Sequence, residues 1–477
     1  MKLRKLGCLC IVLVILLGII FLLPGNVSAA RRIEQGSCGK NVEFTLDQAG
    51  VLTIYGSGRM EDYYGNAPWA VCSDRIHTVV IEEGVTYIGA TAFLRCYKLQ
   101  KVTLPDSLTD IGSRAFEECS GLTEVVIPEN VTSIGESAFK DCKKLESITL
   151  PSGLSVISVA AFAGCTALRE ITLPQSLCLL EPWAFSRCES LEQIEIPGLI
   201  TTIADGTFAA CVSLTRVTLG DEVNTIGKAA FKNCSSLVEL EIPSGVTEIG
   251  ESAFSGCEKL SHMEIPDGVT TIGEEAFLNC GSLQTVRIPD SVTSVGIGVF
   301  RFCTGLTEVK LGSGLKSIGT NMFYGCTALE SIVIPDNITW IGFGAFAGCK
   351  NLVWVQLPDS LTGMGEFAFK DCDRLYHVFY EGTRQQYKAL EFRGEERSPI
   401  QSAVWHYGQS ADVVNELETE NEGFINSLRL LYYENYPFFI TFMIPPVAIV
   451  AISAWVLLLA MMAMVLIKLD KRRNATK

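Results

Sequence analysis

The chain has 477 residues, of which 53 are acidic and 38 basic, and its formal net charge at pH 7 is −15. A chain of this length has room for about three domains, and its negative charge argues against nucleic acid or an anionic lipid surface as the partner. Hydrophobic residues make up 48% of the chain, and two long apolar runs near its ends contribute strongly to that share.

The chain begins with a segment typical of a secretory signal. Lys2, Arg4 and Lys5 precede an apolar run over residues 6–23, and small residues follow up to position 30. Signal peptidase recognises such a basic start, apolar run and small-residue end, so we interpret residues 1–29 as a cleaved signal peptide. The apolar run has 18 residues, which is also long enough for an uncleaved membrane anchor. That anchor is the alternative interpretation.

Residues 30–75 are predicted to form an N-terminal cap. Two alternating runs, over residues 42–46 and 51–55, are separated by a turn and predict a β-hairpin. Such a hairpin would cover the open edge and apolar end of the first repeat. Cys38 and Cys72 lie in this region, outside the repeat, and are either joined in a disulfide or two free thiols.

The centre of the chain, residues 76–380, repeats with a period of 23 residues. Phenylalanine recurs 13 times from position 93 to position 369, each time followed by cysteine three residues later and leucine six residues later. Within one copy, Leu99, Val102 and Leu104 alternate with polar residues, which predicts a strand with one buried face. Pro105 ends that strand, and the segment from Ala115 to Cys119 spans about one helical turn.

A single coil of 23 residues cannot bury its own apolar centre, so the coils must stack. The period therefore predicts one right-handed, β-rich solenoid that is capped at both ends. We expect one continuous parallel sheet on one face and short helical turns on the other. The 13 cysteines of the repeat are interpreted as small buried residues that fill the same position in every coil, because they lack the spacing of a zinc site.

The recurring pattern L-x-x-[IV]-x-[IL]-P-x-x-[VL]-x-x-[IV]-G-x-x-A-F-x-x-C resembles the BspA-like, or Treponema-type, leucine-rich repeat. The resemblance covers residues 76–379, and the segments on either side resemble the caps of that family. It implies a leucine-rich-repeat array that binds a partner at the cell surface and has no catalytic activity. Departures from the pattern include Gly220 and Gly312 in place of the strand-ending proline, Leu180-Glu181 and Ile203-Ala204 in place of Ile-Gly, and Gly206-Thr207 before one phenylalanine.

Beyond the repeats, residues 381–407 have helical spacing around Tyr387 and Leu390 followed by a strand-like run, and are predicted to form the C-terminal cap. Residues 408–436 include an acidic stretch that is typical of a solvated juxtamembrane linker. Residues 437–467 contain no charged residue and are long enough for one transmembrane helix. A basic tail follows over residues 468–477.

Both basic ends are predicted to lie in the cytoplasm by the positive-inside rule, which puts the repeats outside the cell. The prediction is a single-pass protein of the cell membrane, held in the lipid bilayer by its C-terminal helix. Without the leader's three positive charges and the tail's net four, the exterior portion carries about −22. Asn130 and Asn337 stand in N-x-T motifs and would be glycosylation sites in a eukaryotic host.

No catalytic residue, cofactor or metal is expected. The chain has four histidines, and none has a nucleophile or carboxylate at a spacing that predicts a site, except that His262 neighbours Glu239 and Glu264 on adjacent strands. The sequence also contains no phosphate-binding loop and no nucleophile elbow. We therefore expect the partner to be a protein or glycoprotein outside the cell, and not nucleic acid.

Two groups of outward-facing strand residues are candidates for partner binding. The acidic group lies in the middle of the array and the aromatic group at its C-terminal end. An ordinary solvated face would explain the acids, and packing under the C-terminal cap would explain the aromatics. The acidic group is Glu195, Glu239, Glu241 and Glu264, and the aromatic group is Trp354, Tyr376, His377 and Phe379.

The predicted function is adhesion or recognition through a concave sheet. The warrant is a long rigid surface with varied side chains, together with the family resemblance. The alternative is a structural surface-coat or spacer protein that acts by self-association.

Overall fold

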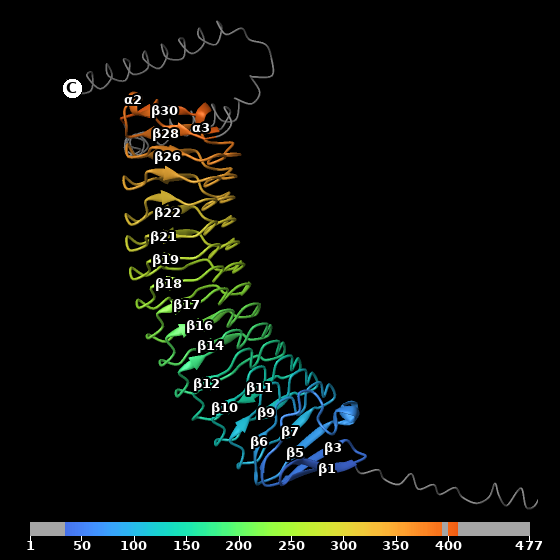
Figure 1. The fold of residues 1–477 in the computed structure, drawn as a ribbon. Helices are drawn as coiled ribbons and strands as arrows, with labels where there is room; N and C mark the ends of the chain where they lie inside the picture. The colour runs from blue at the N-terminus through green and yellow to red at the C-terminus, as the bar shows by residue number, and fades with distance from the viewer. Residues whose placement is uncertain (1–33, 394–398, 409–477) are drawn as a thin grey trace, which may run out of the picture. The chain divides into compact units, whose positions relative to one another are not determined.

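The computed structural model describes residues 34–393 and 399–408, which belong to one compact unit. Figure 1 shows a stack of coils that begins at β1 (Glu34–Gly39) and ends at β30 (Val404–Tyr407). Each repeat forms one coil, because its leucine, phenylalanine and cysteine positions are buried together and fill the centre. This confirms the predicted β-solenoid.

The first side of each coil carries the predicted strand. In β7 (Lys101–Thr103) the central Val102 is buried while its two neighbours are exposed, because alternate residues of a strand point to opposite faces. Strands of neighbouring coils pair in parallel with a shift of 23 residues, as between Ser147 and Glu124. The other repeat strands on this side are β5 (Thr78–Ile81), β9 (Glu124–Val126), β11 (Ser147–Thr149), β14 (Gln193–Glu195), β16 (Arg216–Thr218), β20 (Thr285–Arg287), β22 (Glu308–Lys310), β24 (Ser331–Val333), β26 (Trp354–Leu357) and β28 (His377–Tyr380).

This first sheet is interrupted, so the prediction of one continuous sheet is wrong. Its ladder ends at β11 and resumes at β14, and residues 170–173 between them form no strand. It is broken again between β22 and β24, while Glu239 and His262 form an isolated bridge. The coils stay together at these places through bonds on another side of the coil. The N–H of Phe162, for example, donates to the oxygen of Ala184 at 2.9 Å.

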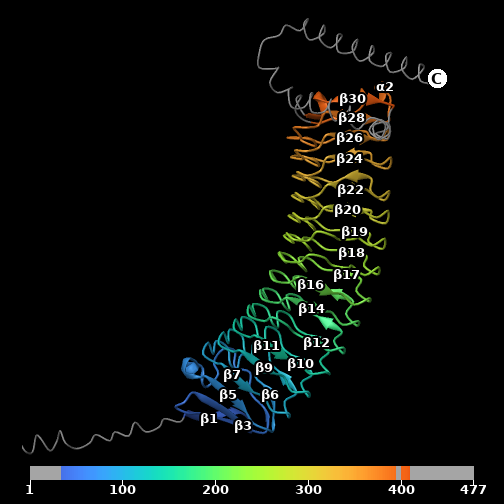
Figure 2. The same ribbon diagram turned by 180° about the vertical axis from the view of Figure 1, so that it is seen from behind.

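A second parallel sheet, which the sequence did not predict, occupies the next side of the coil (Figure 2). Its ladder is also interrupted, after residue 180 and after residue 295. Its strands are mostly the two residues before the repeat's glycine, and the second of them, such as Ile111, is buried. Two residues are too few to show an alternating pattern in the sequence. The strands are β4 (Gly58–Arg59), β6 (Val85–Ile88), β8 (Asp110–Ile111), β10 (Ser133–Ile134), β12 (Val156–Ile157), β13 (Leu179–Leu180), β15 (Thr202–Ile203), β17 (Thr225–Ile226), β18 (Glu248–Ile249), β19 (Thr271–Ile272), β21 (Ser294–Val295), β23 (Ser317–Ile318), β25 (Trp340–Ile341), β27 (Gly363–Met364) and β29 (Glu391–Phe392).

The third side, which we call the turn side, holds the Ala-Phe-x-x-Cys segment. It consists of tight turns, so the predicted helical turn is wrong. In all 13 repeats the residues two positions before and two positions after phenylalanine have positive φ, as in Thr91 at 55° and Arg95 at 61°. Left-handed residues interrupt a right-handed helix. Their N–H groups instead bond to the next coil, Thr91 to the oxygen of Ser113 at 2.9 Å and Arg95 to that of Glu117 at 2.9 Å.

The phenylalanine rings form one stack through the core. The rings of Phe116 and Phe139 lie 5.2 Å apart with an interplanar angle of 6°, and similar stacked contacts link each successive pair of the column. Trp69 extends the stack into the N-terminal cap, 5.6 Å from Phe93. The rings therefore join neighbouring coils as well as filling each one.

The cysteine column is buried as predicted, and its thiols also form hydrogen bonds. The Sγ of Cys119 donates to the backbone oxygen of Phe93 in the preceding coil at 3.1 Å. The same bond recurs in later coils up to Cys372. Burial raises the pKa of Cys211 and of Cys257 to about 12, so both are protonated at neutral pH.

We expect thiol reactivity to be confined to the surface. Cys178 is the one exposed cysteine of the described residues, and its thiol donates to the backbone oxygen of Ser155, just before β12, at 3.3 Å. Among described positions, a maleimide at about pH 7.5 should label Cys178 first. Peptide mass spectrometry with a Cys178→Ser control checks this. Labelling of a column cysteine in the folded chain at the same rate would contradict the packing.

The N-terminal cap contains the predicted hairpin. β2 (Val42–Leu46) pairs antiparallel with β3 (Val51–Gly56), and β1 adds a third strand on the outer edge of β2. β3 then pairs in parallel with β5, so the cap continues the first sheet directly. A 3-10 helix, η1 (Ala70–Arg75), leads into the first repeat.

The two cysteines of this cap are free thiols in the structure. Cys72 donates to a carboxylate oxygen of Glu34 at 2.8 Å, and the backbone oxygen of Cys38 accepts from the Tyr63 hydroxyl at 2.7 Å. A disulfide between Cys38 and Cys72 stays a prediction.

The C-terminal cap has the predicted helical turn and last strand. The helix α2 (Arg384–Tyr387) is capped by Thr383, and α3 (Pro399–Ser402) precedes β30, which pairs in parallel with β28. None of the described residues forms a helix that is long and apolar enough to cross a membrane. The predicted leader, anchor and tail, and nearly all of the acidic linker, lie outside the described residues.

Candidate functional site

The candidate site is the outer face of the first sheet, formed by the residues on either side of each buried strand centre. Figures 1 and 2 show these strands repeating at corresponding positions in successive coils. Because the coils are in register, each outward position forms a column along the stack. The frame is therefore regular, while the side chains in the columns differ from coil to coil.

The predicted acidic residues lie on this face and are exposed. Glu195 stands on β14, and Glu239, Glu241 and Glu264 lie in two coils where the ladder is reduced to the bridge between Glu239 and His262. The 23-residue register puts Glu241 beside Glu264, which concentrates negative potential there.

A hollow of about 440 Å³ lies on the first sheet where the ladder is interrupted. It is lined by residues of three successive coils, including Glu170, Gln193, Glu195 and Arg216. The hollow therefore places Glu195 beside a second carboxylate and a guanidinium. Its mixture of charges and amides fits a polar contact better than an apolar anchor.

The aromatic group is brought together at the C-terminal end, but one member is buried. The rings of Trp354 and Phe379 meet edge to face at 5.9 Å. β30 covers Phe379, whose ring stacks on His406 at 4.7 Å and is 6% exposed. The expectation that Phe379 is exposed is therefore wrong, because the cap strand β30 covers its ring. Trp354, Tyr376 and His377 are half-buried.

The cap strand also pairs two histidine rings. Nδ1 of His377 lies 3.2 Å from Nε2 of His406, so one ring donates and the other accepts. Burial lowers the pKa of His406, which favours the neutral ring. The sequence did not place His406 in this cluster. His406 lies in the cap, where the 23-residue period has ended, so the period does not predict which residue it faces on the neighbouring strand.

Acid should weaken this end of the stack. An unfolded histidine has a pKa of about 6.5, whereas folding lowers that of His406. Below about pH 6.5 the unfolded state therefore binds more protons than the folded state. The stability that is present above the unfolded pKa is lost as the pH falls from there toward the lower pKa of the folded state. We expect the unfolding midpoint to drop between about pH 7.5 and 5.5, and by less in a His406→Gln variant. Equal pH dependence of both proteins would contradict this role.

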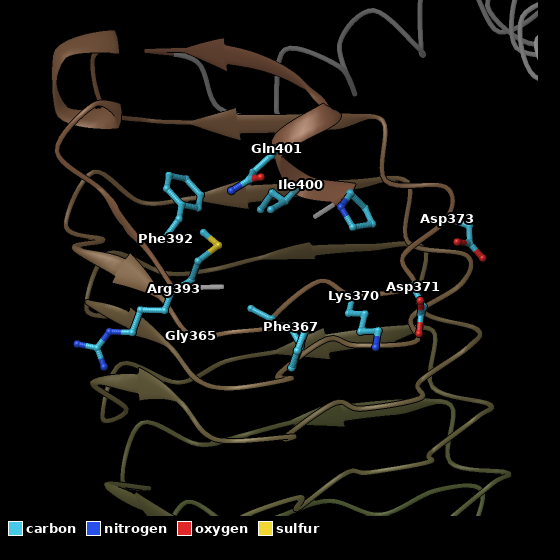
Figure 3. A pocket seen from close by; sticks show the side chains of 12 residues that line it. Gly365, Phe367, Lys370, Asp371, Asp373, Phe392, Arg393, Ile400 and Gln401 are labelled. Atoms are coloured by element: carbon cyan, nitrogen blue, oxygen red, sulfur yellow. The ribbon is translucent and has the colours of Figure 1, made fainter. Parts of the chain in front are cut away.

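A smaller cavity of about 230 Å³ lies between the last coil and the C-terminal cap (Figure 3). Phe367 and Lys370 border it on the repeat side, and Phe392, Arg393 and Ile400 on the cap side. It is the seam where the regular stack meets the cap. Among the residues that the structure describes, no group of three or more histidine, cysteine or acidic side chains is arranged to hold a metal ion.

Comparison with known proteins identifies the repeat. A family model described as the BspA type leucine-rich repeat region matches residues 70–192, 179–307, 226–342 and 270–396. The chain is similar to a leucine-rich repeat protein from Bacteroides ovatus, with 27% identity, coverage of 79% of this chain and 98% of that one, and a TM-score of 0.63. It is also similar to a leucine-rich cell surface protein from Faecalibacterium prausnitzii, with 31% identity, coverage of 75% and 97%, and a TM-score of 0.45.

No curated protein matches the chain. The similarity to the Bacteroides ovatus leucine-rich repeat protein extends over nearly all of that protein's length. The family model covers more than half of the chain, and the repeated leucine, phenylalanine and cysteine positions within the matched residues are buried. This protein therefore belongs to the BspA-type leucine-rich repeat family.

Proposed function

We propose that the protein is a cell-surface recognition or adhesion protein that binds a protein or glycoprotein partner outside the cell. The observation that carries the proposal is the outer face of the first sheet, where a register of 23 residues holds varied side chains on a fixed frame. Membership of a repeat family whose members are typically surface-exposed supports it. Leucine-rich repeat proteins in general bind other proteins.

Membrane anchoring is part of this proposal. It rests on the basic leader, the uncharged run over residues 437–467 and the basic tail. External protease applied to intact cells should remove the repeats while the tail stays protected. Complete protection of the repeats would reverse the proposed topology.

The two groups on the sheet face would contribute differently to binding. Trp354, Tyr376 and His377 retain accessible surface beside the cap, and aromatic anchors supply more binding energy per residue than exposed charges. The exposed glutamates would mainly attract a basic partner and speed its approach. Phe379 would support the ring of Trp354 from below and not contact the partner itself.

Replacing Trp354 with alanine should therefore weaken binding more than tenfold while leaving the array folded. Reversing the charges of Glu239, Glu241 and Glu264 should mainly slow association, and added salt should have the same effect. Thr293→Ala is the matched control, because Thr293 is exposed and lies just before β21, away from the first sheet. Surface plasmon resonance measures both rates.

The partner itself can be sought by pull-down with the soluble ectodomain, residues 31–407. A specific protein or glycoprotein supports the proposal, and recovery of only the chain itself favours the surface-coat alternative. Normal binding by the Trp354→Ala variant, together with loss of binding on charge reversal, would move the site to the acidic middle of the sheet.

A further inference from the structure

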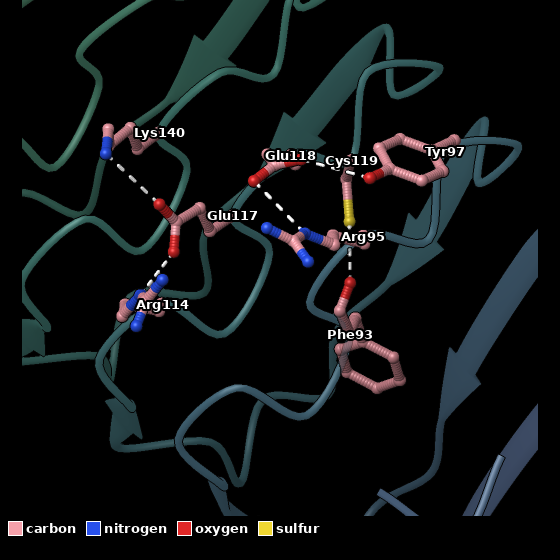
Figure 4. Close-up of polar contacts among 8 residues, drawn as sticks. All are labelled: Phe93, Arg95, Tyr97, Arg114, Glu117, Glu118, Cys119 and Lys140. Carbon is pink, nitrogen blue, oxygen red and sulfur yellow. Dashed lines mark hydrogen bonds and ion pairs between the residues drawn. The ribbon is translucent and has the colours of Figure 1, made fainter. Parts of the chain in front are cut away.

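The turn side of the stack changes in character along the chain. In the N-terminal coils its outward positions carry charges that pair with one another (Figure 4). Glu117, although buried, forms ion pairs with Arg114 and Lys140, and Glu118 with Arg95 at 3.2 Å. These charges are satisfied within the chain, so this part of the turn side has little to offer a partner.

Three consecutive coils nearer the C-terminus are different. Their outward turn positions contain no carboxylate, and three large apolar side chains are exposed there, Ile297 by 48%, Phe302 by 37% and Phe343 by 44%. We call this surface the aromatic turn face. Its exposed or half-buried residues are Ile297, Arg301, Phe302, Thr320, Asn321, Tyr324, Phe343 and Gly348.

The rings of this face are held in place by their neighbours. Phe302 and Tyr324 meet edge to face at 5.3 Å, and the guanidinium of Arg301 lies 5.0 Å and 5.2 Å from their ring centres. Gly325 makes room for Phe302, since a Cβ there would lie 2.5 Å from the ring. The Nε of Arg301 is buried with no hydrogen-bond partner in the described part of the chain. A preordered apolar surface of this kind loses little entropy on binding.

We propose that the aromatic turn face binds the same face of a second copy, with the two stacks antiparallel about a two-fold axis at Tyr324. A two-fold interface must be complementary to itself. In this arrangement the coils on either side of Tyr324 exchange places between copies. Ile297 then meets Phe343, and the protruding ring of Phe302 meets the open backbone of Gly348.

Charge selects this occupant and this direction. The chain carries 53 acidic against 38 basic residues, so two copies repel over most of their surfaces, and the aromatic turn face is free of carboxylates. Glu275 lies one coil before the face and forms an ion pair with Arg301 at 3.8 Å, while Lys370, whose Nζ is 4.9 Å from the Phe367 ring, lies one coil beyond the face. An antiparallel pair would set the coil of Glu275 against the coil of Lys370 in the other copy, so that Lys370 adds a second cation near this ion pair, whereas a parallel pair opposes like charges. Glu274 and Glu366 also meet, but at the solvated rim, where the cost is small.

Disulfide trapping tests the arrangement in the full-length chain with Cys178→Ser as the parent. A cysteine on the axis meets its own copy, so Tyr324→Cys should give a covalent dimer under mild oxidation. Ile297→Cys and Phe343→Cys should each give little alone and a dimer when mixed. Equal trapping at all three positions, or none at any of them, would overturn the proposal.

Sedimentation of the full-length chain in detergent gives a second readout. Ile297→Glu combined with Phe343→Glu should raise the dimer dissociation constant more than tenfold, while Leu199→Glu, which is 56% exposed away from this face, should leave it unchanged. Glu275→Lys and Lys370→Glu should each weaken the dimer, and together restore it. A monomeric parent, or a charge swap no better than the single changes, would overturn the proposal. Either result leaves binding through Trp354 untouched, since that residue lies on another side of the coil.

Discussion

Replacing Phe231 with alanine should lower the free energy of unfolding by about 3–5 kcal/mol. The ring is fully buried and stacks between Phe208 and Phe254, with both ring centres at 5.4 Å. Truncation removes its burial, leaves a cavity in the coil and breaks two stacked contacts, each worth about 0.5–1.5 kcal/mol beyond area burial. Because the stack is nearly one-dimensional, the loss should be local and weaken the two adjacent interfaces.

Hydrogen exchange followed by mass spectrometry is the appropriate measurement, since it reports each coil separately. Amides from about residue 208 to residue 254 should lose protection first. Val238→Ala is the matched control, because Val238 is in the same coil but its side chain is 44% exposed. A loss below about 1 kcal/mol for Phe231→Ala, or uniform loss of protection along the whole chain, would show that the rings do not couple neighbouring coils.

The fold was predictable because the 23-residue period places the same residue type at the same position in every coil. Phe231, Cys234 and Leu237 are buried where the pattern placed them. The second sheet was not predictable, because strands such as β17 have two residues and leave no alternation to detect. The left-handed residues of the turn side were also hidden. Glycine at these positions would have indicated a left-handed backbone, but many of them hold other residues, such as Glu118 at a φ of 60°.

The alternating pattern correctly predicts which residues of the first sheet are exposed in the middle of the array, but not at its C-terminal end. Glu239 and Glu264 are exposed as the alternation predicts. Phe379 obeys the same alternation but is covered by β30, whose position depends on the irregular cap. The aromatic turn face escaped notice because it lies beside the most regular part of the motif. Tyr324 follows a constant phenylalanine of the repeat and Phe302 precedes a constant cysteine. The exposed aromatic residues are therefore hard to distinguish from the buried ones in the sequence.

The glycine of the Ile-Gly pair is predicted to be the least replaceable small residue of the repeat. In the structure Gly273 lies against the preceding coil, and a Cβ there would be 2.4 Å from the backbone nitrogen of Glu251 and 2.6 Å from the carbonyl carbon of Gly250. Real Cβ atoms do not approach backbone so closely, so the two coils would have to separate. This would stretch the bond from the N–H of Gly273 to the oxygen of Ile249, now 2.8 Å.

Other coils do carry a Cβ at this position. Ser158, Glu181 and Ala204 stand there in three successive coils, and the second sheet continues from β12 to β13 but is broken between β13 and β15. It is also broken between β21 and β23, where both coils carry the glycine. At Gly273 the Cβ would meet the backbone of the coil before it, so Gly273→Ala should open a break between β18 and β19. We expect a cost of about 1–3 kcal/mol, as for other overpacked sites.

Gly153→Ala is the matched control, because nothing lies within 4 Å of the Cβ it would introduce. That change should be neutral or slightly stabilising, by up to about 1 kcal/mol, since alanine restricts the unfolded chain more than glycine does. Denaturant unfolding of the two variants, with hydrogen exchange at Ile249 and Ile272, separates the outcomes. If both substitutions have the same effect, close contact with the preceding coil is not the reason for glycine at this position. The recurrence of glycine would then have to be explained by the backbone conformation there.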